Sequence, residues 1–279
     1  MNFKDKTVII TGGSEGVGAA SARAFARAGA NLVLAARNKR NLETIAEELR
    51  AITRVEIMAM DVSDADACVK LFKKAQFEFE SVHVLVNNAG YHERGQVESV
   101  SAHDLGKMID VNLKAPIMLS RYAIPYIREA GEGAIINVAS LAGRTPVPGA
   151  AVYSASKFGL RAFTFSLAEE LKDTKIKLAV VSPGPIDTGF IMSNIDNVTD
   201  LTFSQPLSTA DEVANEILAI CSNAKRERSM PPISGLLTTI SYLFPSVGRI
   251  LRPLLEKKGR NVKRRLKAEI YKASQKESS

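Results

Sequence analysis

Cysteine and histidine are scarce in this 279-residue chain. The two cysteines, Cys68 and Cys221, form no CxxC motif and have no metal-site spacing, so we expect two reduced thiols rather than a disulfide. The three histidines, His83, His92 and His103, have no companions that would complete a ligand set, and we predict no bound metal. No apolar stretch approaches the roughly 20 residues of a membrane-spanning helix. The first residues also lack the apolar core and cleavage site of a signal peptide, which favours a cytoplasmic protein.

Charge is unevenly distributed along the chain. The net charge is +7, but the residues from Arg249 onward include eleven Lys or Arg and three Asp or Glu, which gives +8 for this tail and leaves −1 for the rest. A basic tail on a near-neutral body indicates contact with an anionic surface. Apart from Tyr271, the tail lacks the interleaved aromatic residues of nucleic-acid binding segments. We therefore expect a lipid surface rather than nucleic acid as its partner.

Short apolar runs alternate with longer helical patterns along most of the chain. The runs at 7–11, 31–36, 55–60, 82–86, 134–138 and 177–181 predict strands, and the patterns at 18–28, 41–52, 64–79, 101–129, 152–171 and 211–223 predict helices. Pro116 and Pro125 are expected to bend or restart the long fourth helix. The alternation predicts an α/β fold with one doubly wound, Rossmann-type parallel sheet and helices on both faces. Ligands of such sheets bind beyond the carboxyl ends of the strands.

A glycine-rich segment, TGGSEGVG, connects the first strand to the first helix at residues 11–18. Its glycines allow a tight turn in which the backbone approaches a pyrophosphate, while the helix N-terminus supplies free N–H groups. Its position between an apolar strand and an alanine-rich helix favours a dinucleotide site over an ordinary turn. The residues predicted to bind the cofactor here are Gly12, Ser14, Glu15, Gly16, Val17 and Gly18.

The ends of the following strands refine the cofactor prediction. Arg37 follows the second strand, where an acidic residue would favour NAD, and its guanidinium suits the 2′-phosphate of NADP. Glu15 lies in the same region and would repel that phosphate, so NADP(H) is preferred and NAD(H) stays an alternative. Asp61 follows the third strand, where it can accept a hydrogen bond from the adenine amino group or cap the next helix. The NNAG sequence at 87–90 can line the cofactor crevice or form an ordinary turn.

Tyr153 and Lys157 are four residues apart in a predicted helix, which places them one turn apart on the same face. An ammonium beside a phenol favours the phenolate and lowers the tyrosine pKa from its reference value of about 10. The pair therefore predicts a general acid/base that works near neutral pH. Taken alone, such a pair also fits a solvated helix surface.

The order and spacing of these motifs resemble the short-chain dehydrogenase/reductase family over about residues 6–190. The resemblance rests on TGGSEGVG, Asp61-Val62, NNAG, Asn112 in DVNLKAP, Ser140 in NVASLAG, YSASK at 153–157 and PGPIDT at 183–188. The resemblance implies further cofactor contacts from Asp61, Val62, Asn88, Ala89, Gly90, Tyr153, Lys157, Pro183, Gly184, Ile186 and Thr188.

The resemblance also implies a role for each catalytic residue. Tyr153 would be the general acid/base, and Lys157 would lower its pKa and hold the nicotinamide ribose. Ser140 would orient the substrate oxygen, and Asn112 would hold a water that relays protons from Lys157. The helices at 101–129 and 152–171 resemble those that pair across subunits in this family, so a homodimer or homotetramer is expected.

The C-terminal part departs from the family pattern. Members commonly finish on a seventh strand and a V-D-G-G ending; this chain lacks that ending, although 228–230 could form a short strand. We therefore predict a catalytic domain at 1–230 and a C-terminal extension at 231–279, as in a subgroup with an extended tail. The extension is either a helical cover that narrows the substrate mouth or a peripheral membrane anchor. The candidate anchor residues are Leu236, Leu237, Ile240, Tyr242, Leu243 and Phe244.

The leading hypothesis is an NADP-dependent oxidoreductase that transfers a hydride between nicotinamide and a carbonyl or secondary alcohol. The loop at 190–206 is expected to be a mobile substrate lid or to pack on the sheet edge. Its apolar residues favour a hydrophobic or lipid-like substrate, and they are Phe190, Ile191, Met192, Leu201 and Phe203. The alternatives are a 3-oxoacyl carrier-protein reductase and a non-catalytic NADP-binding regulatory protein.

Overall fold

The structure of the protein is a computed structural model in which residues 1–192 and 195–277 are described. Seven strands form one parallel sheet in the order β3-β2-β1-β4-β5-β6-β9. The strands are β1 (Thr7–Thr11), β2 (Asn31–Ala36), β3 (Val55–Ala59), β4 (Val84–Asn87), β5 (Gly133–Val138), β6 (Ile176–Pro183) and β9 (Glu227–Met230). The strand order reverses between β1 and β4, which confirms the predicted doubly wound sheet and creates a crevice at that point.

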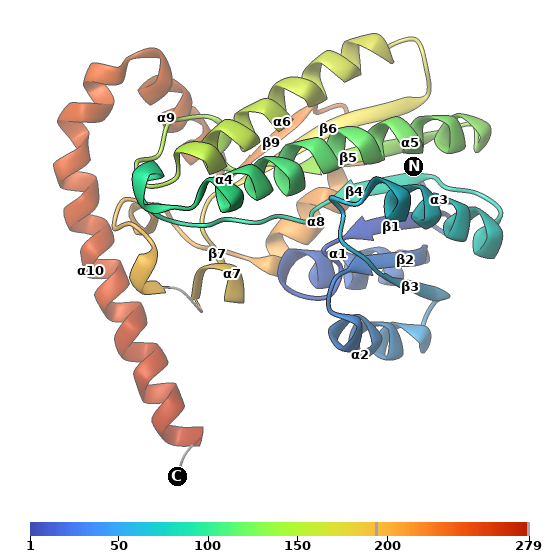
Figure 1. Ribbon diagram of the computed structural model, residues 1–279, viewed down its shortest axis with the longest axis horizontal. Coiled ribbons are helices and arrows are strands. Elements are labelled where there is room, and N and C mark those ends of the chain that lie inside the picture. The colour runs from blue at the N-terminus through green and yellow to red at the C-terminus, as the bar shows by residue number, and fades with distance from the viewer. Residues whose placement is uncertain (193–194, 278–279) are drawn as a thin grey trace.

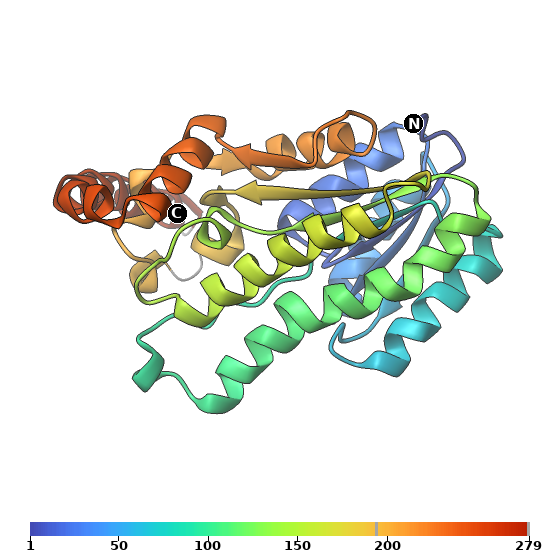
Figure 2. The same ribbon diagram turned by 90° about the horizontal axis from the view of Figure 1, so that it is seen from above.

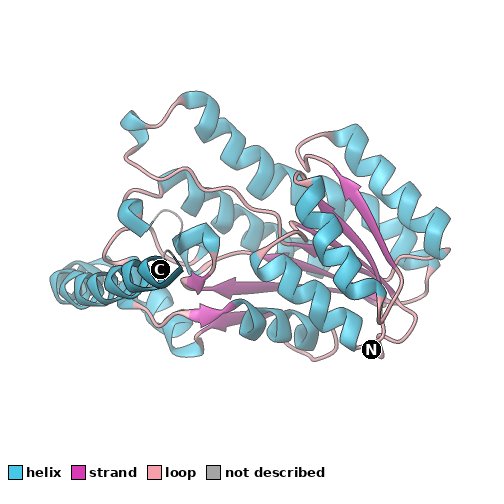
Figure 3. Ribbon diagram, turned by 90° about the horizontal axis from the view of Figure 1, so that it is seen from below, coloured by secondary structure: helices cyan, strands magenta, loops and turns pink. Residues whose placement is uncertain are grey.

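Helices cover both faces of the sheet (Figure 3). One face packs against α1 (Gly16–Arg27), α2 (Lys39–Arg50) and α8 (Ala210–Ile220), and the other against α3 (Ala65–Phe79), α5 (Ala115–Glu129) and α6 (Ala151–Glu170). Successive residues of a strand point to opposite faces, so Ile10 joins the first cluster and Ile9 the second, and both are fully buried. This two-sided burial explains why the strands read as continuous apolar runs.

The long helical pattern at 101–129 divides into three parts. Helix α4 (Ala102–Ile109) runs into a π-helical turn, η2 (Asp110–Lys114), and α5 follows directly. Pro116 lies in the first turn of α5, directly after the π-helical turn at which the type of helix changes. Pro125 lies inside α5. The π turn matters for function because it contains Asn112.

The chain continues beyond the expected catalytic domain as two helices. Strand β9 pairs in parallel with β6, so the possible strand at 228–230 is confirmed as the seventh strand of the sheet. Helix α9 (Pro232–Leu243) and the long helix α10 (Pro245–Glu277) follow, and α10 carries the basic tail. The arrowheads of β6 and β9 point toward the side on which α9 and α10 lie (Figure 2). Among the described residues, no helix has both the length and the apolar character needed to cross a membrane.

The loop at 190–206 forms short helices that pack on α10 rather than on the sheet edge. The segment includes α7 (Gly189–Met192), η4 (Ile195–Asn197) and η5 (Thr202–Ser204), next to the small strand pair β7 (Ile186–Asp187) and β8 (Ser208–Thr209). Its apolar side chains form a cluster with Val262 and Leu266 of α10. Figure 1 shows the backbone of this segment beside α10. Residues 193 and 194 of this loop lie outside the described residues.

Candidate active site

The glycine-rich turn between β1 and α1 has backbone positions that only glycine fits. Gly12 and Gly16 have positive φ angles of 64° and 51°. A Cβ atom on Gly18 would lie 1.9 Å from the carbonyl oxygen of Gly12, so the helix approaches the turn very closely. Glu15 precedes α1 without a side-chain hydrogen bond to its first turn, which leaves the N–H groups there available to an anion. This cradle fits the pyrophosphate of a dinucleotide.

Asn88 connects the end of β4 to the glycine-rich turn. Its side-chain nitrogen donates to the carbonyl oxygens of Thr11 at 3.0 Å and Gly12 at 3.3 Å. The Thr11 hydroxyl accepts hydrogen bonds from the backbone N–H of Asn88 at 3.0 Å and of Ala89 at 3.1 Å. Through these contacts the NNAG segment lines the same cavity as the turn, in the crevice where the strand order reverses.

Arg37 and Asp61 lie at the carboxyl ends of β2 and β3 and line the same cavity. Arg37 is exposed, and within the described residues it has no ion pair with a carboxylate. Asp61 accepts hydrogen bonds from the backbone N–H and the hydroxyl of Ser63, at 2.9 and 2.7 Å. Burial acts to raise the pKa of Asp61, but the Ser63 hydrogen bonds and the charge of Arg37 outweigh it and lower the pKa. Asp61 does not cap α3, because the side chain of Asp64 does.

Ser140, Tyr153 and Lys157 meet at the carboxyl end of β5. Ser140 follows the strand, its Oγ accepts the backbone N–H of Ala142 at 3.1 Å, and its hydroxyl lies close enough to the Tyr153 phenol to act to lower the phenol pKa. Lys157 is buried, and its Nζ donates to the carbonyl oxygen of Val138 at 2.9 Å. The same Nζ lies 5.8 Å from the centroid of the Tyr153 ring, and burial lowers the pKa of Lys157 to about 8. Three of the four predicted catalytic side chains therefore share one site.

The prediction of a lowered tyrosine pKa is wrong for this arrangement. Burial raises the pKa of Tyr153, and the opposing effects of the Ser140 hydrogen bond and the Arg94 charge are smaller. Lys157 is not among the groups that lower the phenol pKa here; its Nζ donates to the Val138 carbonyl oxygen and lies 5.8 Å from the centroid of the Tyr153 ring. Tyr153 is therefore a protonated phenol at neutral pH, a state suited to donating a proton.

Asn112 lies in the π-helical turn between α4 and α5 and is fully buried. Its side chain accepts the backbone N–H of Tyr91 at 2.8 Å and donates to the Tyr91 carbonyl oxygen at 2.7 Å. It also donates to the Ser156 hydroxyl at 3.2 Å, one residue before Lys157. Asn112 thus fixes both the segment after NNAG and the helix that carries Tyr153.

A buried polar chain beneath the site was not predicted from the sequence. Asn87 at the end of β4 donates to Asn137 of β5 at 2.8 Å and to Ser120 of α5 at 3.3 Å. Asn137 in turn donates to Thr164 of α6 at 2.8 Å. This network spans two strands and two helices and fixes the spacing of α5 and α6 relative to the sheet, while the Asn87 Oδ1 atom has no hydrogen-bond partner in the described part of the structure. The signal in the sequence that could have indicated this network is an asparagine near the end of each of two predicted strands, Asn87 and Asn137.

One cavity of about 880 Å³ joins the glycine-rich turn to the cluster of Ser140, Tyr153 and Lys157, while Asn112 and the buried polar chain lie behind its wall. Its cofactor end is lined by the glycine-rich turn, Arg37, Asp61 and Val62, and its centre by Ser140, Tyr153 and Lys157. The loop after β6 contributes Pro183, Gly184, Ile186 and Thr188. The far wall was not predicted in detail and consists of side chains from α9 and α10, which include Leu237, Ile240, Tyr242, Val247 and Leu251.

The segment after NNAG contributes two site residues, His92 and Arg94, that were not predicted from the sequence. The His92 ring stacks on the Tyr153 ring, with centroids 4.1 Å apart and planes 11° apart. Arg94 lines the cavity close enough to Tyr153 for its charge to lower the phenol pKa. Their position directly after the cofactor motif was the only signal, because no spacing rule identifies them.

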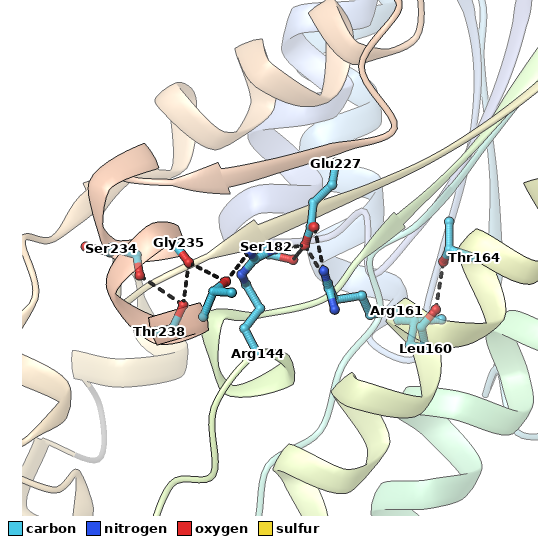
Figure 4. A network of polar contacts seen from close by, with 10 residues as sticks. Arg144, Leu160, Arg161, Thr164, Ser182, Glu227, Ser234, Gly235 and Thr238 are labelled. Carbon is cyan, nitrogen blue, oxygen red and sulfur yellow. Dashed lines mark hydrogen bonds and ion pairs between the residues drawn. The ribbon is translucent and has the colours of Figure 1, made fainter. Parts of the chain in front are cut away.

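A charged network links this site to the C-terminal extension (Figure 4). Glu227 of β9 binds Arg161 of α6 through two contacts of 2.7 and 2.9 Å, and it also pairs with Arg144 and accepts the Ser182 hydroxyl at 3.2 Å. Arg144 follows the short turn that begins at Ser140, and it donates to Thr239 of α9 at 2.7 Å. The catalytic loop, the seventh strand and α9 are therefore held together.

The Rossmann-type sheet, the dinucleotide cradle and the Tyr-Lys-Ser cluster together define a nicotinamide-dependent oxidoreductase. The family model for short chain dehydrogenases matches residues 6–198, and the protein belongs to this family. The match covers the sheet through β6 and the site residues up to Thr188, while β9, α9 and α10 lie beyond it.

Characterised and uncharacterised relatives agree with this assignment. Sulfoacetaldehyde reductase 2 of Chromohalobacter salexigens is 38% identical over 187 residues, which are 66% of this chain and 74% of that protein. An uncharacterized oxidoreductase of Staphylococcus saprophyticus is 35% identical over 208 residues, 74% of this chain and 82% of its own. One from Staphylococcus aureus is 32% identical over 209 residues, 75% and 89% of the two chains. The protein is thus an NAD(P)-dependent oxidoreductase.

Proposed function

We propose that the protein is an NADPH-dependent reductase of a carbonyl group in an apolar substrate, with the reverse alcohol oxidation open to it. One observation carries this proposal: a single cavity runs from the dinucleotide cradle past Tyr153 to the apolar side chains of α9 and α10. A substrate in that cavity would place its reacting carbon near Tyr153 and its apolar part against the two helices.

The residues toward the cofactor end fit NADPH. The turn at 12–18 would hold the pyrophosphate, Arg37 the 2′-phosphate, and Asp61 with Val62 the adenine. Asn88, Ala89 and Gly90 would line the crevice, and Pro183, Gly184, Ile186 and Thr188 the nicotinamide end. When bound, NADPH supplies the hydride.

The protein's own groups would position the substrate and supply the proton. The Ser140 hydroxyl would donate a hydrogen bond to the substrate oxygen and hold it beside Tyr153. Tyr153 would give its phenolic proton to that oxygen, which its raised pKa permits because the phenol stays protonated. Lys157 would hold the ribose hydroxyls, and Asn112 would support the path by which a proton returns to the site.

NADPH oxidation with 3-oxo substrates of increasing alkyl chain length tests this function. The rate should rise with chain length, because a longer chain covers more of the wall formed by α9 and α10. Tyr153→Phe should lose turnover by roughly 10²-fold or more while it still binds NADPH. Activity confined to short polar carbonyls, such as the aldehyde in the name of the Chromohalobacter relative, would contradict the apolar substrate. Near wild-type turnover of Tyr153→Phe would contradict the catalytic assignment.

The preference for NADPH over NADH rests on Arg37. Its guanidinium lines the cavity without a carboxylate partner among the described residues, whereas Asp61 is already bonded to Ser63. The dissociation constants of both cofactors should be measured for wild type, Arg37→Ala and the exposed control Arg27→Ala. We expect Arg37→Ala alone to weaken NADPH by about tenfold or more and to leave NADH unchanged. Equal dissociation constants of NADPH and NADH for wild type would contradict the proposed preference for NADPH.

We also propose that the enzyme is cytoplasmic and contacts anionic membranes peripherally through residues 231–279. Eleven of the seventeen large apolar side chains that are exposed in the described chain lie between Ile233 and Leu254. Basic residues follow them along α10, from Arg249 to Lys267. An amphipathic surface with this charge suits an anionic lipid layer.

Sedimentation with phosphatidylglycerol vesicles tests the membrane contact. Binding should be strong at low salt and weaken as salt rises. Replacing Leu243 and Phe244 by serine should reduce it, whereas Phe77→Ser, which removes an exposed apolar side chain of α3, should not. An absence of binding at low salt would eliminate the contact and leave α9 and α10 as a cover of the cavity. For the proposed homodimer or homotetramer, light scattering should give a multiple of the 30.2 kDa chain mass.

A further inference from the structure

Two polar side chains beside Tyr153 have no part in the proposed proton transfer. His92 lies between two aromatic rings, stacked on Tyr153 and 6.4 Å from Phe190 between ring centroids. Arg94 donates to the Phe190 carbonyl oxygen at 3.2 Å, and its guanidinium carbon lies 5.4 Å from the centroid of the Phe190 ring. Both side chains line the cavity.

Arg94 is a partly buried cation on which the charge of neighbouring Glu93 acts only from a distance. No carboxylate in the described part of the chain forms an ion pair with it, and the carboxylate of neighbouring Glu93 accepts the Tyr91 hydroxyl instead, at 3.0 Å. The guanidinium has five N–H donors and uses one for the Phe190 carbonyl oxygen. Burial lowers its pKa, as expected for a charge that is partly removed from water. A cation held in this way is stabilised when an anion binds beside it.

His92 offers a second, neutral hydrogen-bonding group at the same place. Burial lowers its pKa to about 3, and the positive charges of Arg94 and Lys157 add to the effect, so the imidazole is neutral at working pH. Its Nε2 is buried and has no hydrogen-bond partner in the described part of the structure. A buried polar atom without a partner is costly unless a ligand satisfies it.

The position of the two groups separates them from the cofactor phosphates. Arg37 and the glycine-rich turn line the other end of the cavity, whereas Arg94 contacts Phe190, two residues beyond Thr188, and acts on the Tyr153 phenol. We propose that Arg94 and His92 bind a carboxylate of the substrate close to its reacting carbonyl, so that the substrate is an amphipathic oxo acid. Its carboxylate binds to Arg94, and its apolar chain extends toward α9 and α10. This inference rests on the proposed reductase function.

The test compares an oxo acid with its neutral ester. NADPH oxidation is measured with 3-oxododecanoate and with its methyl ester for wild type, Arg94→Gln, Arg94→Lys and the exposed control Arg27→Gln. Wild type should prefer the acid, and Arg94→Gln should raise the KM of the acid by about 10- to 100-fold with little effect on the ester. Arg94→Lys should recover part of the loss, and Arg27→Gln should behave as wild type. His92→Phe, which keeps a ring against Tyr153, should raise the KM of the acid by a smaller factor.

Two results would overturn the inference while leaving the reductase function intact. One is an Arg94→Gln variant that loses the same factor of activity with the acid and with the ester, and whose pH profile is displaced to higher pH. Arg94 would then be a residue that acts through Tyr153. The other is a wild-type preference for the ester. Calorimetry gives a readout without turnover: dodecanoate should bind the NADPH complex of Tyr153→Phe more tightly than that of Tyr153→Phe/Arg94→Gln. Equal affinities there would refute the carboxylate site even if no oxo substrate were reduced.

Discussion

Replacing Glu227 by glutamine should destabilise the protein, because this carboxylate holds two arginines that have little access to water. The exposed side-chain fractions are 16% for Glu227, 13% for Arg144 and 29% for Arg161. Arg161 binds the carboxylate through both oxygens, at 2.7 and 2.9 Å. Removing one partner of a buried ion pair typically costs about 3–5 kcal/mol. Since glutamine keeps one oxygen acceptor, we expect the free energy of unfolding to fall by about 2–3 kcal/mol.

Urea denaturation of Glu227→Gln and a matched control measures this effect. The control is Glu169→Gln, because Glu169 pairs with Arg226 at the surface, where the side chains are 61% and 56% exposed. Exposed pairs of this kind contribute little, so the control should unfold as wild type does. If Glu227→Gln lowered the free energy of unfolding by no more than the control does, the argument that this network holds β9 and α9 to the catalytic loop would be refuted.

The same pair predicts a dependence on pH. Burial acts to raise the pKa of Glu227, but the hydrogen bonds from Arg161 and Arg144 outweigh it, so the folded-state pKa lies below the usual 4.5. The unfolded chain therefore binds this proton more readily, and the stabilisation is fully present above the unfolded pKa and lost as pH falls through the folded one. The difference in unfolding free energy between wild type and Glu227→Gln should be constant down to about pH 5 and shrink below it.

Two glycines give further predictions. Gly18→Ala should weaken NADPH binding by about tenfold or more with the fold retained, because a Cβ there meets the Gly12 carbonyl oxygen at 1.9 Å and must shift the cradle; equilibrium dialysis would detect it. Gly259→Ala should make α10 more sensitive to trypsin, because its Cβ would lie 1.7 Å from the Asp200 carbonyl oxygen and separate α10 from the segment at 195–204. The control is Gly106→Ala on α4, because its Cβ would meet nothing within 4 Å; it should stabilise its helix by about 0.5–1 kcal/mol. If Gly259→Ala were no more sensitive to trypsin than Gly106→Ala, the argument that Gly259 allows the close contact between α10 and the segment at 195–204 would be contradicted.

The sheet and the cofactor cradle could be predicted because their signals are local. Six strands appear as predominantly apolar runs, since helices cover both faces of the sheet, and the structure places them within three residues of the predicted limits. The seventh strand gives a weaker signal. Its Glu227 and Arg228 are polar because they lie at the sheet edge and serve ion pairs with α6 and α8. The glycine-rich turn was recognisable because close backbone approach restricts the residue type at Gly18.

The parts that could not be predicted depend on contacts between distant segments. The tyrosine pKa was expected to fall because Lys157 is one turn away, but burial of the phenol dominates, and burial is a property of the whole fold. The only signal for Arg94 in the sequence is its position just after NNAG, because its place beside Tyr153 depends on how the segment after NNAG returns to α6. The segment at 190–206 was expected to be a substrate lid or to pack on the sheet edge, and its packing partner, a helix some sixty residues later in the chain, was not predicted.

The C-terminal extension is therefore better understood as a wall of the active site than as an appendage to a finished enzyme. The family match ends at residue 198, but the cavity that begins at the cofactor cradle is closed by side chains from α9 and α10. Arg144 and Glu227 connect α9 to the loop that carries Ser140. Helix α10 contacts the loop at 190–206 through Lys263, whose Nζ donates to the carbonyl oxygens of Asp196 at 3.0 Å and Val198 at 2.6 Å. Because the apolar surface of these helices continues from the cavity wall to the outside, the same residues that would bind an alkyl chain would also face a membrane. Substrate selection and membrane contact would then be properties of one structural unit, which follows the part of the chain that the family model matches.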